Sequence, residues 1–162
     1  MKAALWYGVR DVRVEEIEEP KVTKGNIKIK VKWCGICGSD LHEYLGGPIF
    51  IPVGQPHPIS GNVAPVVLGH EFSGDVVEIG ENVTNIKVGD RVTVEPIVAC
   101  GKCPACKEGK YNLCSSLGFH GLCGSGGGLA EYTVFPEEYV HKIPDNMSYE
   151  QAALIEPIAV AL

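Results

Sequence analysis

The sequence lacks an excess of basic residues and any long uninterrupted hydrophobic run. Its 20 acidic and 14 basic side chains give a formal net charge of −6, so the chain offers no basic surface for nucleic acid or an anionic membrane. No apolar run approaches the ~20 residues of a membrane-spanning helix, and the first residues do not form the apolar core of a signal peptide. We therefore expect a cytoplasmic protein that binds neither nucleic acid nor membrane.

The sequence also lacks the glycine-rich strand–turn–helix unit that binds the diphosphate of a dinucleotide. Residues 124–128 are rich in glycine, but the third glycine of the GxGxxG pattern is missing and the next segment is strand-like. Internal repeats and low-complexity segments are absent as well. A dinucleotide is therefore not expected to bind within these 162 residues.

The composition is that of one ordinary globular domain, with 45% hydrophobic and 21% charged residues. Residues 26–33 alternate between apolar side chains and lysines, which predicts a strand with a buried apolar face and a solvated lysine face. A hairpin at residues 1–16 and strands at residues 91–95, 130–135 and 139–143 are predicted from similar patterns. Many short strands separated by turn residues favour a mainly β protein built as a partly closed antiparallel barrel.

Two short helices are expected beside these strands. The first would cover residues 39–44 with Ser39 as its N-cap, which places the Cys37 thiol near the helix N-terminus. The second begins with a capping-box pattern at residues 148–151, and Pro157 should kink or interrupt it. Because this last segment is apolar, we expect another element to cover it.

A histidine–glutamate pair, His70 and Glu71, stands between an apolar run and an alternating run, a pattern that predicts a turn between two strands. Such a turn projects its side chains into a cleft, where another segment can meet them. The best candidate is Cys37, which follows the strand at residues 26–33 in a glycine-flanked turn. Thiolate, imidazole and carboxylate are the ligands of catalytic zinc, which keeps one position open for water or substrate.

Four more cysteines lie close together, separated by two, two and seven residues: Cys100, Cys103, Cys106 and Cys114. Four thiolates complete a tetrahedron around zinc and leave no open position, so this spacing predicts a structural zinc site. An iron–sulfur cluster is the competing interpretation, but the ferredoxin pattern places its fourth cysteine after three residues and before proline. The remaining cysteines, Cys34 and Cys123, are expected to be small packing residues.

Both metal-binding patterns resemble those of the zinc-containing medium-chain alcohol and polyol dehydrogenases. The spacing Gly69-His70-Glu71-x-x-Gly74 is similar to the catalytic-zinc signature of that family, and the four-cysteine spacing is similar to its structural-zinc lobe. Segments 35–42, 88–92, 127–132 and 154–157 also follow the family pattern in order. The resemblance covers all 162 residues and is closest to the 2,3-butanediol (acetoin) dehydrogenases.

This resemblance implies two Zn2+ ions per chain, one catalytic and one structural. Cys37 and His70 correspond to ligands of the catalytic ion. Glu71 and Glu156 correspond to carboxylates that bind this ion or hold a water beside it. A helix-surface carboxylate is the alternative interpretation of Glu156. The glutamate at this position favours a diol-type substrate over a simple primary alcohol.

The resemblance also implies supporting residues around the catalytic ion. Asp40 corresponds to a group that holds the ligating histidine in the correct tautomer. Ser39 and His42 correspond to the path that carries the proton of the alcohol to solvent, although His42 also fits an exposed polar residue of a short helix. Phe119 and His120 are candidates to line the cleft.

At the level of domains, the resemblance implies a GroES-like catalytic domain at residues 1–147, with the zinc lobe at residues 97–117. Residues 148–162 would begin a helix that leads to a Rossmann domain outside this sequence. The implied enzyme is an NAD(H)-dependent oxidoreductase of a secondary alcohol or diol and its ketone, and a homo-oligomer at full length. We expect these residues alone to be inactive. The alternative is a zinc-stabilised binding or assembly module without chemistry.

Overall fold

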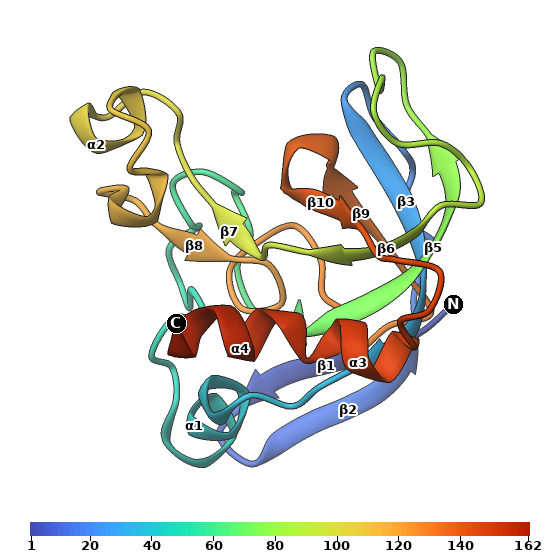
Figure 1. The fold of residues 1–162 in the computed structure, drawn as a ribbon. Helices are drawn as coiled ribbons and strands as arrows, with labels where there is room; N and C mark the ends of the chain where they lie inside the picture. Colours follow the sequence, from blue (N-terminus) through green and yellow to red (C-terminus); the bar gives the residue numbers. More distant parts are fainter.

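The computed structural model describes all 162 residues and contains three antiparallel sheets (Figure 1). The first sheet has the order β2-β1-β4 and contains β1 (Lys2–Gly8), β2 (Asp11–Glu16) and β4 (Val66–Val67). The second has the order β10-β6-β5-β3-β9 and contains β3 (Asn26–Cys34), β5 (Phe72–Ile79), β6 (Arg91–Val94), β9 (Tyr132–Pro136) and β10 (Val140–Lys142). The third pairs β7 (Ile97–Val98) with β8 (Gly118–Phe119).

The helices are short and lie around these sheets. They are α1 (Gly38–Gly46), α2 (Pro104–Lys107), α3 (Tyr149–Ala153) and α4 (Ile155–Ala161), with the 3-10 turns η1 (Tyr111–Leu113) and η2 (Glu137–Tyr139). None of them is long and apolar enough to cross a lipid bilayer. The predicted mainly β, antiparallel architecture is confirmed, and the sheets keep open edges.

The main core lies against the five-stranded sheet, where β3 is hydrogen-bonded to β5 on one side and β9 on the other. Ile27 and Ile29 of β3 are completely buried and belong to one cluster with Phe72 and Phe135. A second cluster around Trp6 joins the first sheet to the loop that follows α1. The two clusters hold β4 and β5 in place, and the turn that contains His70 lies between these strands.

The prediction that the lysines of β3 form a solvated face is only partly correct. Lys28 is 8% exposed, and its ammonium lies 2.9 Å from Glu19 and 2.8 Å from Glu78. Hydrogen bonds to these carboxylates raise the pKa of Lys28. Trp33, predicted to be buried, is 51% exposed. The register against β5 shifts beside Lys28 and again between Val31 and Trp33, which breaks the simple alternation of side chains.

The C-terminal segment forms α3 and α4, which lie nearly end to end in Figure 1. The predicted capping box is confirmed, since Gln151 N donates to Ser148 Oγ at 3.2 Å and Ser148 N donates to Gln151 Oε1 at 3.0 Å. The interruption falls at Leu154, before Pro157, which lies in the first turn of α4. A proline costs no helical hydrogen bond there, because first-turn N–H groups have no intrahelical acceptor.

Candidate metal centres and substrate cleft

Cys37 is held at the junction between β3 and α1. The structure makes Cys37 the N-cap of α1, so the expected N-cap Ser39 is wrong by two residues. The cause is Asp40, whose Oδ2 accepts a hydrogen bond from Cys37 N at 2.9 Å and thereby fixes the start of the helix. The thiol of Cys37 is therefore held at the N-terminus of α1, beside the turn that carries His70 and Glu71.

His70 and Glu71 lie in the turn between β4 and β5, as the strand–turn–strand pattern predicted, and they are only 4% and 8% exposed. Gly69 adopts a φ of +93° in this turn, a value that favours glycine. Gly35 leaves room for the neighbouring carboxylate, because a Cβ built on it would lie 2.2 Å from Glu71 Oε2. Gly35 N also donates to Glu71 O at 2.7 Å.

The structure brings Cys37, His70 and Glu71 together. One potential ligand atom from each lies within 4.8 Å of the corresponding atom of the other two. Ligand atoms around a tetrahedral zinc lie about 3.3 to 3.8 Å apart, so small side-chain adjustments would bring these three atoms to one ion. The donor set of thiolate, imidazole and carboxylate therefore fits catalytic zinc.

His70 also presents a buried nitrogen without a hydrogen-bond partner. Its Nδ1 lies 3.8 Å from Asp40 Oδ1, which is too long for a hydrogen bond, and neither atom has a hydrogen-bond partner. On the other side of the ring, Nε2 lies 3.3 Å from Ser39 Oγ. Burial raises the pKa of Asp40, an effect that the neighbouring His70 opposes. Asp40 is thus placed where it can orient the ring through Nδ1, as the role implied by the resemblance requires.

The three candidate ligands open onto a cavity of about 260 Å³. Phe50, Phe119 and Leu122 give it an apolar wall, and Ser39 lines it beside the ligands. Glu156 of α4 lines the same cavity, although its carboxylate is not among the atoms that lie within 4.8 Å of one another. Glu156 is half-buried, and this burial raises the pKa of its carboxyl group.

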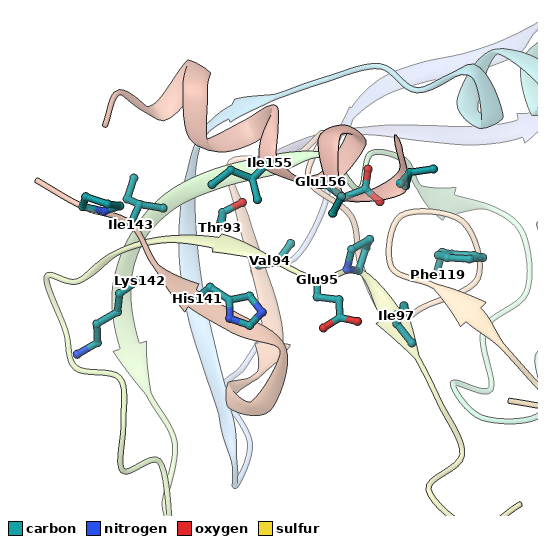
Figure 2. A pocket seen from close by; sticks show the side chains of 14 residues that line it. Thr93, Val94, Glu95, Ile97, Phe119, His141, Lys142, Ile143, Ile155 and Glu156 are labelled. Atoms are coloured by element: carbon teal, nitrogen blue, oxygen red, sulfur yellow. The ribbon is translucent and has the colours of Figure 1, made fainter. Parts of the chain in front are cut away.

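A larger cavity of about 400 Å³ adjoins the first and shares Phe119, Glu156 and Val160 with it. Figure 2 shows Glu156 on the helix, with the strands that carry Val94 and His141 across the cavity. The two cavities together place Glu156 at the boundary between the candidate ligands and an apolar cleft.

Two other candidates lie elsewhere. His42 is exposed on α1 and lines neither cavity. His120 is 1% exposed and packs against Phe135, and its Nε2 lies 2.7 Å from Thr133 Oγ1. Burial lowers the pKa of His120 to about 3, so this ring is a neutral core residue and not part of the cleft. Phe119 does line the cleft.

The four-cysteine segment projects from the body of the molecule, where α2 lies in Figure 1. Its potential ligand atoms, the sulfurs of Cys100, Cys103, Cys106 and Cys114, all lie within 4.8 Å of one another. Cys100 Sγ and Cys106 Sγ are 4.0 Å apart, close to the ~3.8 Å expected between two thiolates on one zinc. Backbone N–H groups of Cys106 and Ser115 lower the pKa of Cys103 to about 6. Four sulfurs this close together fit a structural zinc ion.

The two remaining cysteines are packing residues. Cys34 is half-buried, and burial raises its pKa to about 12. The nearby carboxylates of Asp40 and Glu71 raise it further, so the thiol stays protonated. Cys123 is 2% exposed, and its sulfur accepts a hydrogen bond from Phe119 N at 3.2 Å. All seven cysteines are free thiols, so the structure contains no disulfide framework.

The burial and the hydrogen bonds of Glu43 were not predicted from the sequence. This residue of α1 is 0% exposed, and its carboxylate accepts hydrogen bonds from backbone N–H groups of the loop that leads to Phe50. Glu43 stands in a polar stretch of a short helix, where a glutamate is normally solvated. The only sign of this burial in the sequence is the glycine four residues later, Gly47. A larger residue would not fit there, because a Cβ on Gly47 would lie 2.4 Å from Glu43 Oε2.

The chain is similar to proteins of known family. Residues 23–145 match the family described as alcohol dehydrogenase GroES-like domain. The chain is 62% identical over 162 residues to (R,R)-butanediol dehydrogenase from Bacillus subtilis (strain 168), covering 100% of this chain and 46% of that protein. The crystal structure of 2R,3R-butanediol dehydrogenase from Bacillus subtilis has a TM-score of 0.92 at 62% identity, with coverage of 99% and 45% of the two chains.

A second solved structure carries a cofactor. It is described as a short chain alcohol dehydrogenase from E. coli CFT073 complexed with NADH, and it has a TM-score of 0.84 at 38% identity. The match covers 99% of this chain and 43% of that one. The chain therefore spans slightly less than half the length of the relatives it matches.

Proposed function

This chain belongs to the alcohol dehydrogenase GroES-like domain family, and from that premise we propose that it is the catalytic part of a zinc-dependent NAD(H) oxidoreductase. The proposed substrate is a secondary alcohol or diol, of which butane-2,3-diol is the first candidate, and the product is the corresponding ketone. The relative with 62% identity is named for that diol, and this is what supports the choice.

The observation that carries the proposal is the meeting of Cys37, His70 and Glu71 beside a cavity with an apolar wall. These residues come from two turns that are 33 positions or more apart in the sequence, so local structure alone does not account for the cluster. Two of the three are almost completely buried. A buried imidazole and a buried carboxylate next to a thiol are costly unless a cation or hydrogen bonds compensate them.

In the proposed reaction, a hydride passes from the carbinol carbon to the nicotinamide and a proton passes to solvent, so the alcohol becomes a ketone. Zinc, when bound by Cys37 and His70 with Glu71 or Glu156, would supply a Lewis acid that polarises the substrate oxygen. Asp40 would hold the ring of His70 in orientation through Nδ1.

Ser39 is the residue best placed to receive the proton. Its hydroxyl lines the cavity and lies 3.3 Å from His70 Nε2. His42 is exposed on the same helix, one turn further along, and would release the proton to solvent. Phe50, Phe119 and Leu122 would keep bulk water away from the reacting carbon.

The nicotinamide cofactor requires a further part of the protein. We propose that residues 1–147 are the catalytic domain, that residues 148–162 begin the connection to a cofactor domain, and that residues 1–162 alone do not turn over substrate. The length of the relatives, of which this chain covers 46%, supports this arrangement. The NADH complex of a similar structure supports the choice of cofactor.

The test is metal analysis combined with activity of the full-length enzyme. We expect two zinc ions per chain and NAD+-dependent oxidation of butane-2,3-diol. Cys37→Ala should remove one zinc ion and the activity, whereas the second ion should remain at the four-cysteine lobe. One zinc ion per chain in the unaltered enzyme, unaffected by Cys37→Ala, would instead support a zinc-stabilised binding module without chemistry.

A further inference from the structure

Glu43 has a different environment from an ordinary helix-surface glutamate. Its side chain is 0% exposed, yet it forms no ion pair with any basic residue. The carboxylate accepts hydrogen bonds from three consecutive backbone N–H groups at 2.5 to 3.1 Å, those of Ile49, Phe50 and Ile51. Such bonds to a carboxylate are stronger than those between neutral groups, so Glu43 clamps this loop to α1.

The clamped loop forms part of the candidate substrate cleft. Phe50 lines the same cavity as Cys37 and His70, and its ring meets Phe119 edge-to-face at a centroid distance of 6.2 Å. Phe50 is 51% exposed. Because half of its surface is exposed, packing alone holds the Phe50 ring weakly. The hydrogen bonds from the loop backbone to Glu43 therefore determine the position of this ring.

The neighbouring contacts tie this clamp to the rest of the fold. Trp6 Nε1 donates to Glu43 O at 3.0 Å, and Gly47 N donates to the same oxygen at 3.1 Å. Ile51, at the end of the loop, is 3% exposed and packs in one cluster with Trp6. Glu43 therefore connects a rigid cluster on one side with the exposed ring of Phe50 on the other.

We propose that Glu43 is a positioning residue that sets the size of the substrate cleft by holding Phe50 opposite Phe119. This inference rests on the proposed dehydrogenase function, since it assumes that the alcohol binds beside Cys37 and His70. The fixed aromatic wall favours alcohols with small substituents, such as the methyl groups of butane-2,3-diol. If the Phe50 ring moves away from Phe119, small substrates lose contact with it and the cleft can accept larger secondary alcohols.

The chain offers a matched control. Glu137 forms the same kind of clamp, with Oε1 accepting from Thr84, Asn85 and Ile86 N at 2.5 to 3.1 Å. Neither Glu137 nor the loop it holds lines either cavity of the candidate site. Glu137 is less buried than Glu43, so loss of this clamp should cost less folding free energy, and it should not move Phe50.

The experiment compares the wild-type full-length enzyme with Glu43→Gln, Glu137→Gln and Phe50→Ala, using butane-2,3-diol and heptan-2-ol with NAD+. For Glu43→Gln we expect KM for the diol to rise about tenfold while kcat changes less than about twofold, because one charged acceptor of several N–H groups is lost. The preference for the diol over heptan-2-ol should fall by a similar factor. Phe50→Ala should reduce this preference as well, and Glu137→Gln should leave both substrates unaffected.

Hydrogen exchange of backbone amides provides a second measurement that needs no activity. Glu43→Gln should accelerate exchange at residues 49–51, and Glu137→Gln should accelerate it at residues 84–86. The inference is overturned if Glu43→Gln exchanges faster at residues 49–51 but keeps wild-type preference, or if Phe50→Ala keeps wild-type preference. It is also overturned if Glu137→Gln changes the preference equally. A wild-type enzyme that oxidises no alcohol would instead refute the proposed function, and amide exchange would still report whether the clamp exists.

Discussion

Replacement of Gly35 by alanine tests how strictly the proposed reaction depends on the position of the Glu71 carboxylate. A Cβ at residue 35 would lie 2.2 Å from Glu71 Oε2, 3.2 Å from Glu71 Cβ and 3.3 Å from Glu71 Cδ. An ordinary carbon–oxygen contact is about 3.3 Å or longer, so the carboxylate oxygen must move by about 1.1 Å. The rest of the side chain is close to normal contact distance and needs only a small adjustment.

The displacement of the Glu71 carboxylate in Gly35→Ala should reduce activity much more than folding stability. The oxygen that must move is the end of a flexible side chain, so we expect Gly35→Ala to cost about 1 to 2 kcal/mol of folding free energy, as overpacking usually does. A misplacement of about 1 Å at a reacting centre can reduce the rate about 100-fold. The enzyme should therefore remain folded and lose about two orders of magnitude in kcat/KM for the alcohol.

The assay is steady-state oxidation of butane-2,3-diol by the full-length enzyme, with thermal unfolding measured on the same samples. Gly38→Ala is the matched control, because a Cβ on Gly38 would meet no atom within 4 Å although it is adjacent to Cys37. We expect the control to retain kcat/KM within a few fold. Wild-type kcat/KM in Gly35→Ala would refute the reasoning that the Glu71 carboxylate needs the space beside Gly35 for the reaction.

Two further predictions concern the four-cysteine lobe and the buried His120. Cys103→Ser should release one zinc ion and destabilise the lobe, because three thiolates and a hydroxyl do not hold the ion as four thiolates do; metal analysis that still finds two ions would contradict this. His120 binds protons less readily when folded than when unfolded, since its pKa is lowered from 6.5 to about 3. Stability from this group is present above pH 6.5 and is lost as the pH falls toward 3, by about 2 kcal/mol between pH 7 and pH 5. In His120→Gln, the free energy of unfolding measured by urea denaturation should fall less between pH 7 and pH 5 than it does in the wild type. An equal fall in both proteins would contradict the assignment of a buried, neutral His120.

The strands and the candidate ligands were predictable because both depend on local pattern. Alternation of side chains at residues 26–33 identified β3, and the two-two-seven spacing of the cysteines identified a group of thiols that the structure brings together. Cys37 was predicted as the partner of His70 from its ligand type and its glycine-flanked turn after a strand, but no rule of sequence separation joins the two turns, and support for the pairing came from elsewhere. The resemblance to a known family supplied that link.

The remaining features depend on tertiary contacts that leave little trace in the sequence. Lys28 belongs to an alternating lysine row, but register shifts and two acidic neighbours bury it. His120 stands next to a residue that lines the cleft, yet its ring turns into the core. Glu43 is the clearest case, because only the folded loop brings three N–H groups to its carboxylate.

The central claim is that residues from two distant turns hold one zinc ion that faces a substrate cleft. Its most direct test is an anomalous difference map, measured at the zinc absorption edge, from crystals of the full-length enzyme. We predict two peaks per chain, one among the four cysteine sulfurs and one about 2.3 Å from Cys37 Sγ and about 2.1 Å from a ring nitrogen of His70. A single peak at the four-cysteine lobe, with no density between Cys37 and His70 in zinc-supplemented crystals, would contradict the account.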